Sequence, residues 1–160
     1  MSHLRIISGG QTGVDRAALD AALAAGIACG GWCPRGRRAE DGPISALYPL
    51  QETASARYGA RTRANVRDSD ATLIIVRGMD GFAGGTRLTA READRLGRPL
   101  MVVDLAGPEP RDETAARIAA WLAEHEIAVL NVAGPRESGS PGIYAAARAL
   151  LAPVIQSLIR

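Results

Sequence analysis

The stretch Ile-Ile-Ser-Gly-Gly-Gln-Thr-Gly-Val-Asp-Arg, residues 6–16, predicts both the fold and a candidate binding site. The apolar run at residues 4–7 fits a buried β-strand, the chain turns at Gly9 and Gly10, and a helix follows Gly13. Glycines in such a turn let the backbone approach a ligand closely. The helix start offers free N–H groups and the positive end of the helix dipole. The stretch therefore predicts a site for a phosphate or another oxyanion.

Three side chains near this turn could contact the anion. Thr12 supplies a hydroxyl donor, while Asp15 and Arg16 lie in the first turn of the predicted helix. The motif is neither G-x-G-x-x-G nor a Walker A loop, which needs a lysine after its second glycine. The chain has no lysine among its 19 basic residues, so Schiff-base chemistry is excluded as well. The alternative interpretation is a tight strand-to-helix turn that binds no ligand.

Length and composition predict one domain spanning residues 1–160. A chain of 160 residues with 47% hydrophobic content is long enough to bury a proper core. The net charge of +2 is too small for a general polyanion surface and argues against nucleic acid as a partner. The sequence shows no signal peptide and no apolar run of membrane length, so we expect a cytoplasmic protein without membrane contact.

The two cysteines, Cys29 and Cys33, do not form a recognisable metal or redox motif. Their spacing is one residue longer than that of a redox C-x-x-C pair, and the chain has no second pair to complete a zinc site. Two buried thiols in a reducing compartment are the simplest interpretation.

Apolar runs that fit strands alternate with helical segments along the rest of the chain. The expected strands are residues 4–7, 27–32, 71–76, 100–104 and 127–132, and the expected later helices are residues 53–67, 85–96, 113–126 and 143–158. This alternation predicts an α/β fold, a Rossmann-like three-layer sandwich with about five parallel strands and helices on both faces. We expect the strand order 2-1-3-4-5 and a ligand beyond the carboxyl ends of the strands.

Two further glycine-rich loops follow predicted strands, at residues 81–87 and 134–142. With the expected strand order, the loop at 81–87 lies beside the first one, so two helix starts would converge on one anionic group. The long connection at residues 33–50 carries Arg35, Arg37 and Arg38 and could close over the ligand. A solvated surface loop is the alternative for that connection.

Several segments together resemble the family of molybdenum carrier (molybdenum cofactor carrier) proteins. This Rossmann-like family is related to the lysine decarboxylase-like proteins, which are phosphoribohydrolases, and to the DprA-type DNA-processing proteins. The similarity is carried by residues 8–20, 30–44, 61–74, 84–86 and 130–138.

The resemblance implies a ligand as well as a fold. It suggests binding of molybdenum cofactor (molybdopterin), a pterin with a phosphate and a dithiolene-bound oxomolybdenum, or of a molybdate-like oxyanion. The wider group mostly handles nucleotides, which the same loops could hold. The residues expected at the ligand are Gly9, Gly10, Gln11, Thr12, Gly13, Asp15, Arg16, Arg35, Gly84, Gly85, Thr86, Arg87, Arg136 and Ser138. Cys33 as a direct molybdenum ligand stays open, and no residue is assigned as catalytic or as a metal ligand.

One departure from the related phosphoribohydrolases favours a carrier over an enzyme. Their P-G-G-x-G-T-x-x-E motif ends in a glutamate that acts in N-glycosidic cleavage, whereas Thr89 stands at that place here. A nucleotide-processing or nucleoside-phosphate-processing enzyme stays the second hypothesis, with Glu40, Asp41 or Asp15 as its carboxylate and Glu92 one helical turn beyond Thr89. Binding of single-stranded DNA ranks third, because the aromatic residues form no evident stripe.

The last predicted helix, residues 143–158, is apolar nearly all round. A helix of this kind is usually buried, and the partner that buries it could be a second copy of the chain. We therefore expect a homo-oligomer, a dimer or a tetramer.

Overall fold

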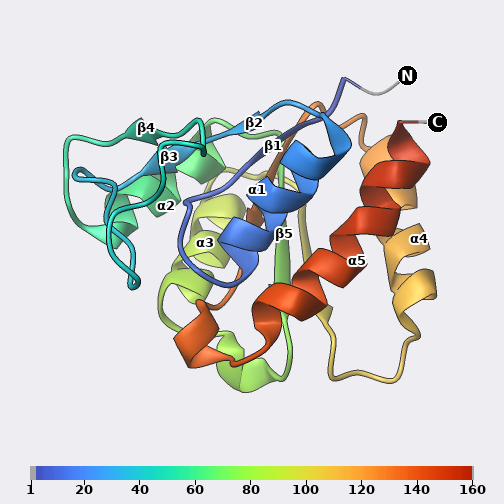
Figure 1. Cartoon of the computed structure of the whole chain (residues 1–160). Helices are drawn as coiled ribbons and strands as arrows, with labels where there is room; N and C mark the ends of the chain where they lie inside the picture. The colour runs from blue at the N-terminus through green and yellow to red at the C-terminus, as the bar shows by residue number, and fades with distance from the viewer. Residues whose placement is uncertain (1–2, 160) are drawn as a thin grey trace.

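The computed structural model describes residues 3–159 and has a five-stranded parallel sheet between two layers of helices (Figure 1). Its strands are β1 (Arg5–Ile7), β2 (Cys29–Gly30), β5 (Ala71–Val76), β6 (Leu100–Asp104) and β7 (Val129–Ala133). Every pairing in this sheet is parallel, and the strand order is β2-β1-β7-β5-β6. The predicted α/β fold class, with parallel strands and helices on both faces, is confirmed.

The expected strand order is wrong at one point, because β7 lies inside the sheet and not at its edge. Its residue Leu130 pairs with Ile6 of β1 on one side and with Ala71 of β5 on the other. The chain leaves β6 and passes beyond β5 before it adds β7. The expected order placed the last strand beside the fourth, whereas the observed connection from β6 skips β5.

The helices form two layers, one on each face of the sheet (Figure 1). The first layer consists of α1 (Val14–Ala25), α4 (Arg111–Glu124) and α5 (Ile143–Leu158), and the second of α2 (Tyr58–Arg67) and α3 (Gly84–Arg95). Short 3₁₀ helices, η1 (Met79–Gly81) and η2 (Glu137–Gly139), precede α3 and α5. None of the helices described has the length and apolar character needed to cross a bilayer.

The chain itself buries the apolar side of α5. This helix packs against α1 and α4, and Leu150 is 0% exposed among Leu19, Ile118 and other members of the main core. Burial of these large aliphatic side chains supplies the main driving force for docking the helix. Packing within one chain therefore explains why α5 is apolar. The homo-oligomer stays a prediction, and this helix gives no support for it.

A second, two-stranded sheet stands at one end of the molecule and holds the long loop (Figure 1). It pairs β3 (Trp32–Cys33) with β4 (Gln51–Glu52), so residues 51–52 are a short strand before the helical segment, which begins only at Tyr58. Arg37 organises the loop between these strands. Its guanidinium donates to the backbone carbonyls of Ile44, Ser45, Tyr48 and Leu50.

Truncating the centre of the α5 interface tests this packing. We expect Leu150→Ala to lower the free energy of unfolding by about 2–5 kcal/mol, because the change leaves a cavity where Leu150 was fully buried. Urea denaturation followed by circular dichroism measures the loss. The exposed Gln156→Ala on the same helix serves as the control and should change stability by less than about 0.5 kcal/mol. Equal effects of the two changes would contradict the assigned faces of α5.

Candidate functional site

A cleft of about 490 Å³ opens at the carboxyl ends of β1, β7 and β5. Its walls are the turns that follow β1 and β7, the start of α3 and one side of α2. The residues that line this cleft include Gly9, Gln11, Asp15, Tyr58, Arg61, Thr62, Asn65, Gly84, Gly85, Thr86, Thr89, Asn131, Gly134, Pro135 and Arg136. The position agrees with the general rule that open parallel sheets bind ligands beyond their carboxyl edge.

Two glycines let the turn after β7 lie close to the turn after β1 and to strand β5. A Cβ atom on Gly13 would lie 2.4 Å from the carbonyl oxygen of Pro135, and one on Gly134 would lie 2.3 Å from that of Ile75. Gly13 also has a φ of 81°, which side chains disfavour. The amide of Val14 donates to Pro135 across the same contact, at 3.3 Å. The backbone of the turn after β1 is therefore held against that of the turn after β7, beside the Gly134 and Pro135 that line the cleft.

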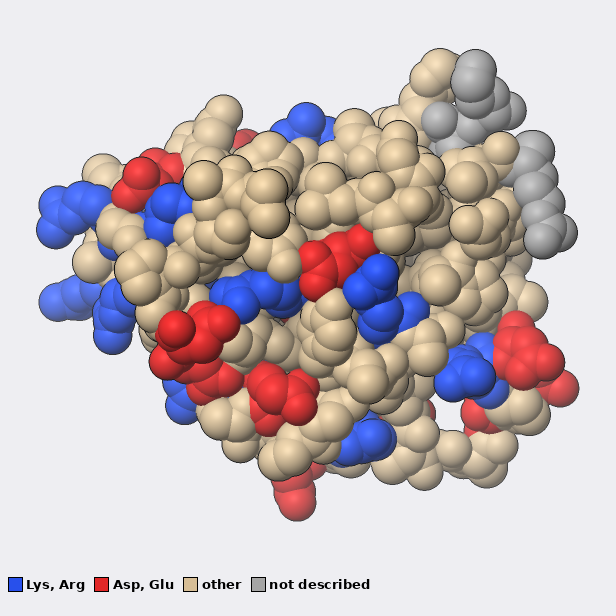
Figure 2. All heavy atoms as spheres, viewed as in Figure 1, with Lys and Arg blue, Asp and Glu red and all other residues tan. Residues whose placement is uncertain are grey.

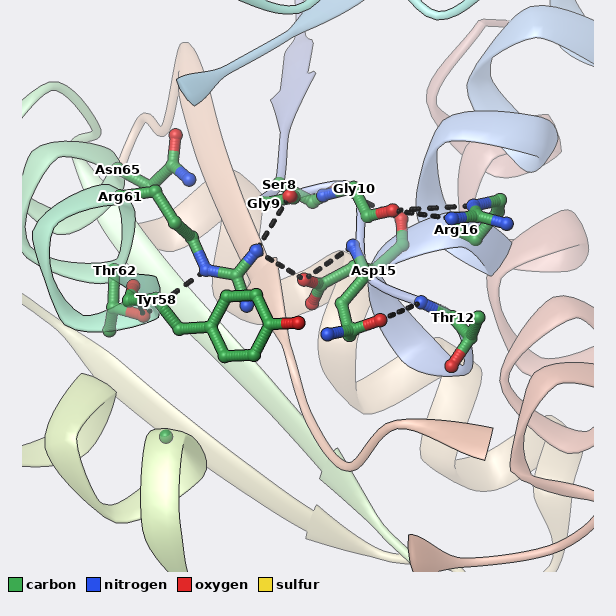
Figure 3. Close-up of polar contacts among 12 residues, drawn as sticks. Ser8, Gly9, Gly10, Thr12, Asp15, Arg16, Tyr58, Arg61, Thr62 and Asn65 are labelled. Atoms are coloured by element: carbon green, nitrogen blue, oxygen red, sulfur yellow. Dashed lines mark hydrogen bonds and ion pairs between the residues drawn. The ribbon is translucent and has the colours of Figure 1, made fainter. Parts of the chain in front are cut away.

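Arg61 from α2 brings a buried positive charge to the cleft. Its side chain is only 10% exposed, and its Nη1 donates to the carbonyl oxygen of Gly9 at 2.7 Å (Figure 3). Among residues 3–159, Nη2 has no acceptor, so it keeps donor capacity for a ligand. Arg61 is not among the contacts expected from the sequence. Its position one helical turn before Asn65, which also lines the cleft, was the available signal.

Asp15 is a buried carboxylate beside Arg61. Its Oδ2 atom lies 3.9 Å from Nη1 of Arg61 and accepts a hydrogen bond from the amide of Gln11 at 3.3 Å. Burial raises the pKa of Asp15 from an ordinary 3.8 to about 6, although the charge of Arg61 partly offsets this effect. A carboxyl group with a shifted pKa in a cleft is a typical feature of functional sites.

The two helix starts near the cleft differ in their free N–H groups. At α3, the amides of Gly84 and Gly85 have no acceptor among residues 3–159, and no side chain caps the helix. At the α1 start, the amides of Gln11, Thr12 and Val14 have partners in the chain, whereas those of Gly13 and Asp15 have no acceptor among residues 3–159. Gly84 and Gly85 both line the cleft, whereas Gly13 does not. The free amides at the α3 start are therefore better placed to meet an anion in the cleft.

The expected contacts separate into two groups. Those that line the cleft are Gly9, Gln11, Asp15, Gly84, Gly85, Thr86 and Arg136. Those that do not are Gly10, Thr12, Gly13, Arg16, Arg35, Arg87 and Ser138. Several members of the second group are engaged elsewhere: Arg16 binds the Asp41 carboxylate at 2.6 Å, and Arg87 donates to the Phe82 carbonyl at 3.4 Å. Tyr58, Arg61, Thr62, Asn65 and Asn131 line the cleft without having been predicted.

The other candidate carboxylates lie outside the cleft lining. Glu40 accepts hydrogen bonds from Thr12 and Ser138, and Glu92 pairs with Arg95 at 3.0 Å. Burial opposes ionisation of Glu40, but the hydrogen bonds from Ser138 and Thr12 outweigh it and lower its pKa. Of the carboxylates considered for an enzyme, Asp15 is the one that lines the cleft.

Neither cysteine presents its thiol to the cleft. Cys33 is 0% exposed and packs with Ala39 and Ile44 in a small second core. Burial raises the pKa of this thiol, so it disfavours the thiolate that a metal would need. In the part of the chain described, no group of three or more His, Cys, Asp or Glu side chains could hold a metal ion.

A pH series tests the state of Asp15. Since its pKa is higher in the folded chain than the ordinary 3.8, the folded state holds the proton more tightly, and stability falls as pH rises from about 4 to about 6. Asp15→Asn cannot ionise and lacks this fall. We expect its unfolding free energy, relative to the unaltered chain, to rise by about 3 kcal/mol between pH 4 and pH 7.5, as measured by urea denaturation.

Asp41→Asn is the matched control, because the hydrogen bond from Arg16 lowers the pKa of Asp41. The stability of Asp41→Asn relative to the unaltered chain should fall as the pH rises through the acidic range in which Asp41 ionises. The reason is that the ionised carboxylate stabilises only the unaltered chain. A difference for Asp15→Asn that does not vary with pH would contradict the shifted pKa.

Comparisons with known proteins agree with this architecture. A solved structure from Syntrophus aciditrophicus SB, named "Putative molybdenum carrier protein", is 45% identical and superposes with a TM-score of 0.90. The match covers 94% of this chain and 93% of that one. No curated protein matches the chain. The family model described as the circularly permutated YpsA SLOG family matches residues 6–155. The suspected relationship is thereby confirmed, and the chain belongs to the circularly permutated YpsA SLOG family.

Proposed function

We propose that this protein is a carrier that binds molybdenum cofactor, or a related phosphate-bearing ligand, in the cleft. The observation that carries the proposal is that Nη2 of Arg61 has no acceptor among residues 3–159 and lies in a cleft that the uncapped start of α3 also lines. A guanidinium and backbone amides are the donors that commonly hold phosphate or molybdate oxygens. The named function of the 45% identical relative supports the same class of ligand.

The strand order favours a ligand larger than a single anion. Strand β7 separates β1 from β5, and two strand spacings amount to roughly 10 Å. One small anion cannot contact the turn after β1 and the start of α3 across that distance. A heterocycle with a phosphate group can do so, and about 490 Å³ lies within the usual range for small-molecule sites.

The residues present fit the ligand's oxyanion groups better than its metal. The cleft offers Arg61, Arg136 and amide donors, whereas the described chain has no cluster of metal-binding side chains. Molybdenum would therefore enter as cargo, kept by the ligand's own dithiolene sulfurs. A carrier with this arrangement needs only to bind, orient and shield its ligand.

An enzyme acting on a nucleotide is the second candidate, and Asp15 favours it. A buried carboxyl group with a pKa of about 6 could donate or accept a proton near neutral pH. No product is expected if the protein is only a carrier. Incubation with a nucleotide panel, followed by chromatography of the products, separates the two functions. Turnover that is lost in Asp15→Asn would support the enzyme.

Charge distribution gives little support to the third hypothesis, DNA binding. Figure 2 shows arginines gathered at the end of the molecule that carries β3 and β4, while acidic and basic side chains alternate across the rest of that face. Binding to single-stranded DNA normally needs a continuous basic groove with stacking aromatic rings. A cytoplasmic location and a homo-oligomeric state remain proposals.

A charge placed at the α3 start tests the carrier site. A Cβ atom on Gly85 meets no heavy atom within 4 Å, and the residue is exposed, so the position accepts a side chain. We expect Gly85→Asp to weaken binding of molybdenum cofactor by about tenfold or more, because its carboxylate would repel the ligand's anion. Native mass spectrometry and thermal shift measure the binding.

Gly85→Asn has nearly the same shape without the charge and is the control. It should retain binding within about threefold of the unaltered chain. Neither variant should lose stability, since both replace a helical glycine and the aspartate also suits a helix start. Equal binding by both variants would reject the α3 start as part of the site. Absence of any stabilisation by molybdenum cofactor, nucleotides, phosphate or molybdate would reject the proposed function.

A further inference from the structure

The side chain of Glu40 occupies a set of anion-binding donors at the rim of the cleft. Its Oε1 atom accepts a hydrogen bond from the Ser138 hydroxyl and lies 3.7 Å from Nε of Arg136. Its Oε2 atom accepts from the Thr12 hydroxyl and, at 3.2 Å, from the amide of Ser138. Each carboxylate oxygen therefore faces two donors, which come from the turns after β1 and β7.

The loop that carries Glu40 does not depend on this side chain for its position. Arg37 fixes the loop internally through backbone carbonyls. Asp41 pairs with Arg16, and the backbone amide of Glu40 donates to the side chain of Gln11 at 2.9 Å. Arg38 stacks over the ring of Tyr58 at 4.7 Å. The Glu40 carboxylate can therefore leave its donors while the loop stays attached.

Arg136 connects these donors to the cleft. It lines the cleft and also lies beside Glu40, and its side chain is 54% exposed, so it is free to turn toward either. An anion in the cleft near Arg136 would compete with the Glu40 carboxylate for the same guanidinium. The donors from Thr12 and Ser138 would then be left for another oxygen of the incoming group.

We propose that Thr12, Arg136 and Ser138 form a second oxyanion subsite, the rim subsite, in which the Glu40 side chain takes the place of a tetrahedral anion such as phosphate or molybdate. The ligand's oxyanion displaces Glu40 when it binds. The inference rests on the proposed function, because it assigns one part of the same ligand to this position. It also explains why Thr12 and Ser138, both expected at the ligand, face a carboxylate and not the cleft.

Neutralising Glu40 removes the internal competitor. We expect Glu40→Gln to bind inorganic phosphate and molybdate about three to ten times more tightly than the unaltered chain, as measured by isothermal titration calorimetry. Glu113→Gln is the matched control, because it removes one negative charge from an exposed side chain on α4 that does not line the cleft. Its affinity should stay unchanged. A larger increase in affinity for phosphate or for molybdate identifies which of the two anions the rim subsite prefers.

A double variant checks that any gain arises at the rim subsite. Glu40→Gln combined with Ser138→Ala lacks a hydroxyl donor and should lose most of the increase. Thermal melts show whether each variant is folded. An unchanged or weaker affinity in Glu40→Gln overturns the rim subsite, as does an equal gain in Glu113→Gln.

The Gly85→Asp variant separates failure of the rim subsite from failure of the carrier function. If the unaltered chain binds an anion and Gly85→Asp loses that binding, the cleft function stands even when Glu40→Gln shows no gain. If no variant binds phosphate, molybdate or molybdenum cofactor, both the rim subsite and the carrier function are rejected.

Discussion

The pairing of β7 with β1 on one side and β5 on the other is the interaction on which the rest of the structure depends. Asn131 at its centre is in register with Ile7 and with Thr72, so one strand aligns both halves of the sheet. Asp70 fixes where this strand begins, because its carboxylate accepts hydrogen bonds from the amides of Ala128 and Val129. The three carboxyl ends that surround the cleft are therefore set by a single register.

That register also determines how the cleft is divided. The turn after β7 lies between the β1 turn and the start of α3, so each provides a separate part of the lining. Arg61 reaches in from α2 and contacts the β1 turn through Gly9, beside the buried Asp15. The buried positive charge in the cleft thus comes from α2, which lies on the same face of the sheet as α3, whose Gly84 and Gly85 also line the cleft.

Local features of the fold could be predicted from the sequence, while its long-range arrangement could not. The apolar run at residues 71–76 is β5 as expected, because a central parallel strand is buried on both faces. The position of β7 had no local signal, since hydrophobic periodicity does not say which strands are neighbours. The helix expected from Thr53 begins at Tyr58, because the Thr53 amide donates to the Cys33 carbonyl and the Ser55 carbonyl accepts from the Arg35 amide.

The candidate site shows the same limit. The glycine-rich turns pointed to Gly9 and Gly84, and both line the cleft, because glycine turns after predicted strands can be recognised in the local sequence. Arg61 contacts Gly9 across 52 positions of the chain, and no local pattern gives that distance. Thr12 and Ser138 donate hydrogen bonds to the carboxylate of Glu40. Glu40 lies on the long loop, and the path of this loop could not be predicted from the sequence.

The long loop owes its shape to one guanidinium. The guanidinium of Arg37 donates hydrogen bonds to backbone carbonyls between positions 44 and 50. In return, the Ile44 amide donates to the backbone carbonyl of Arg37 at 2.7 Å. In other proteins a disulfide or a calcium ion often cross-links a loop of this kind. A cross-link made by an arginine is indifferent to reductants and chelators, and it needs no assembly step after synthesis. The loop beside the cleft therefore keeps its form in a reducing, metal-poor medium.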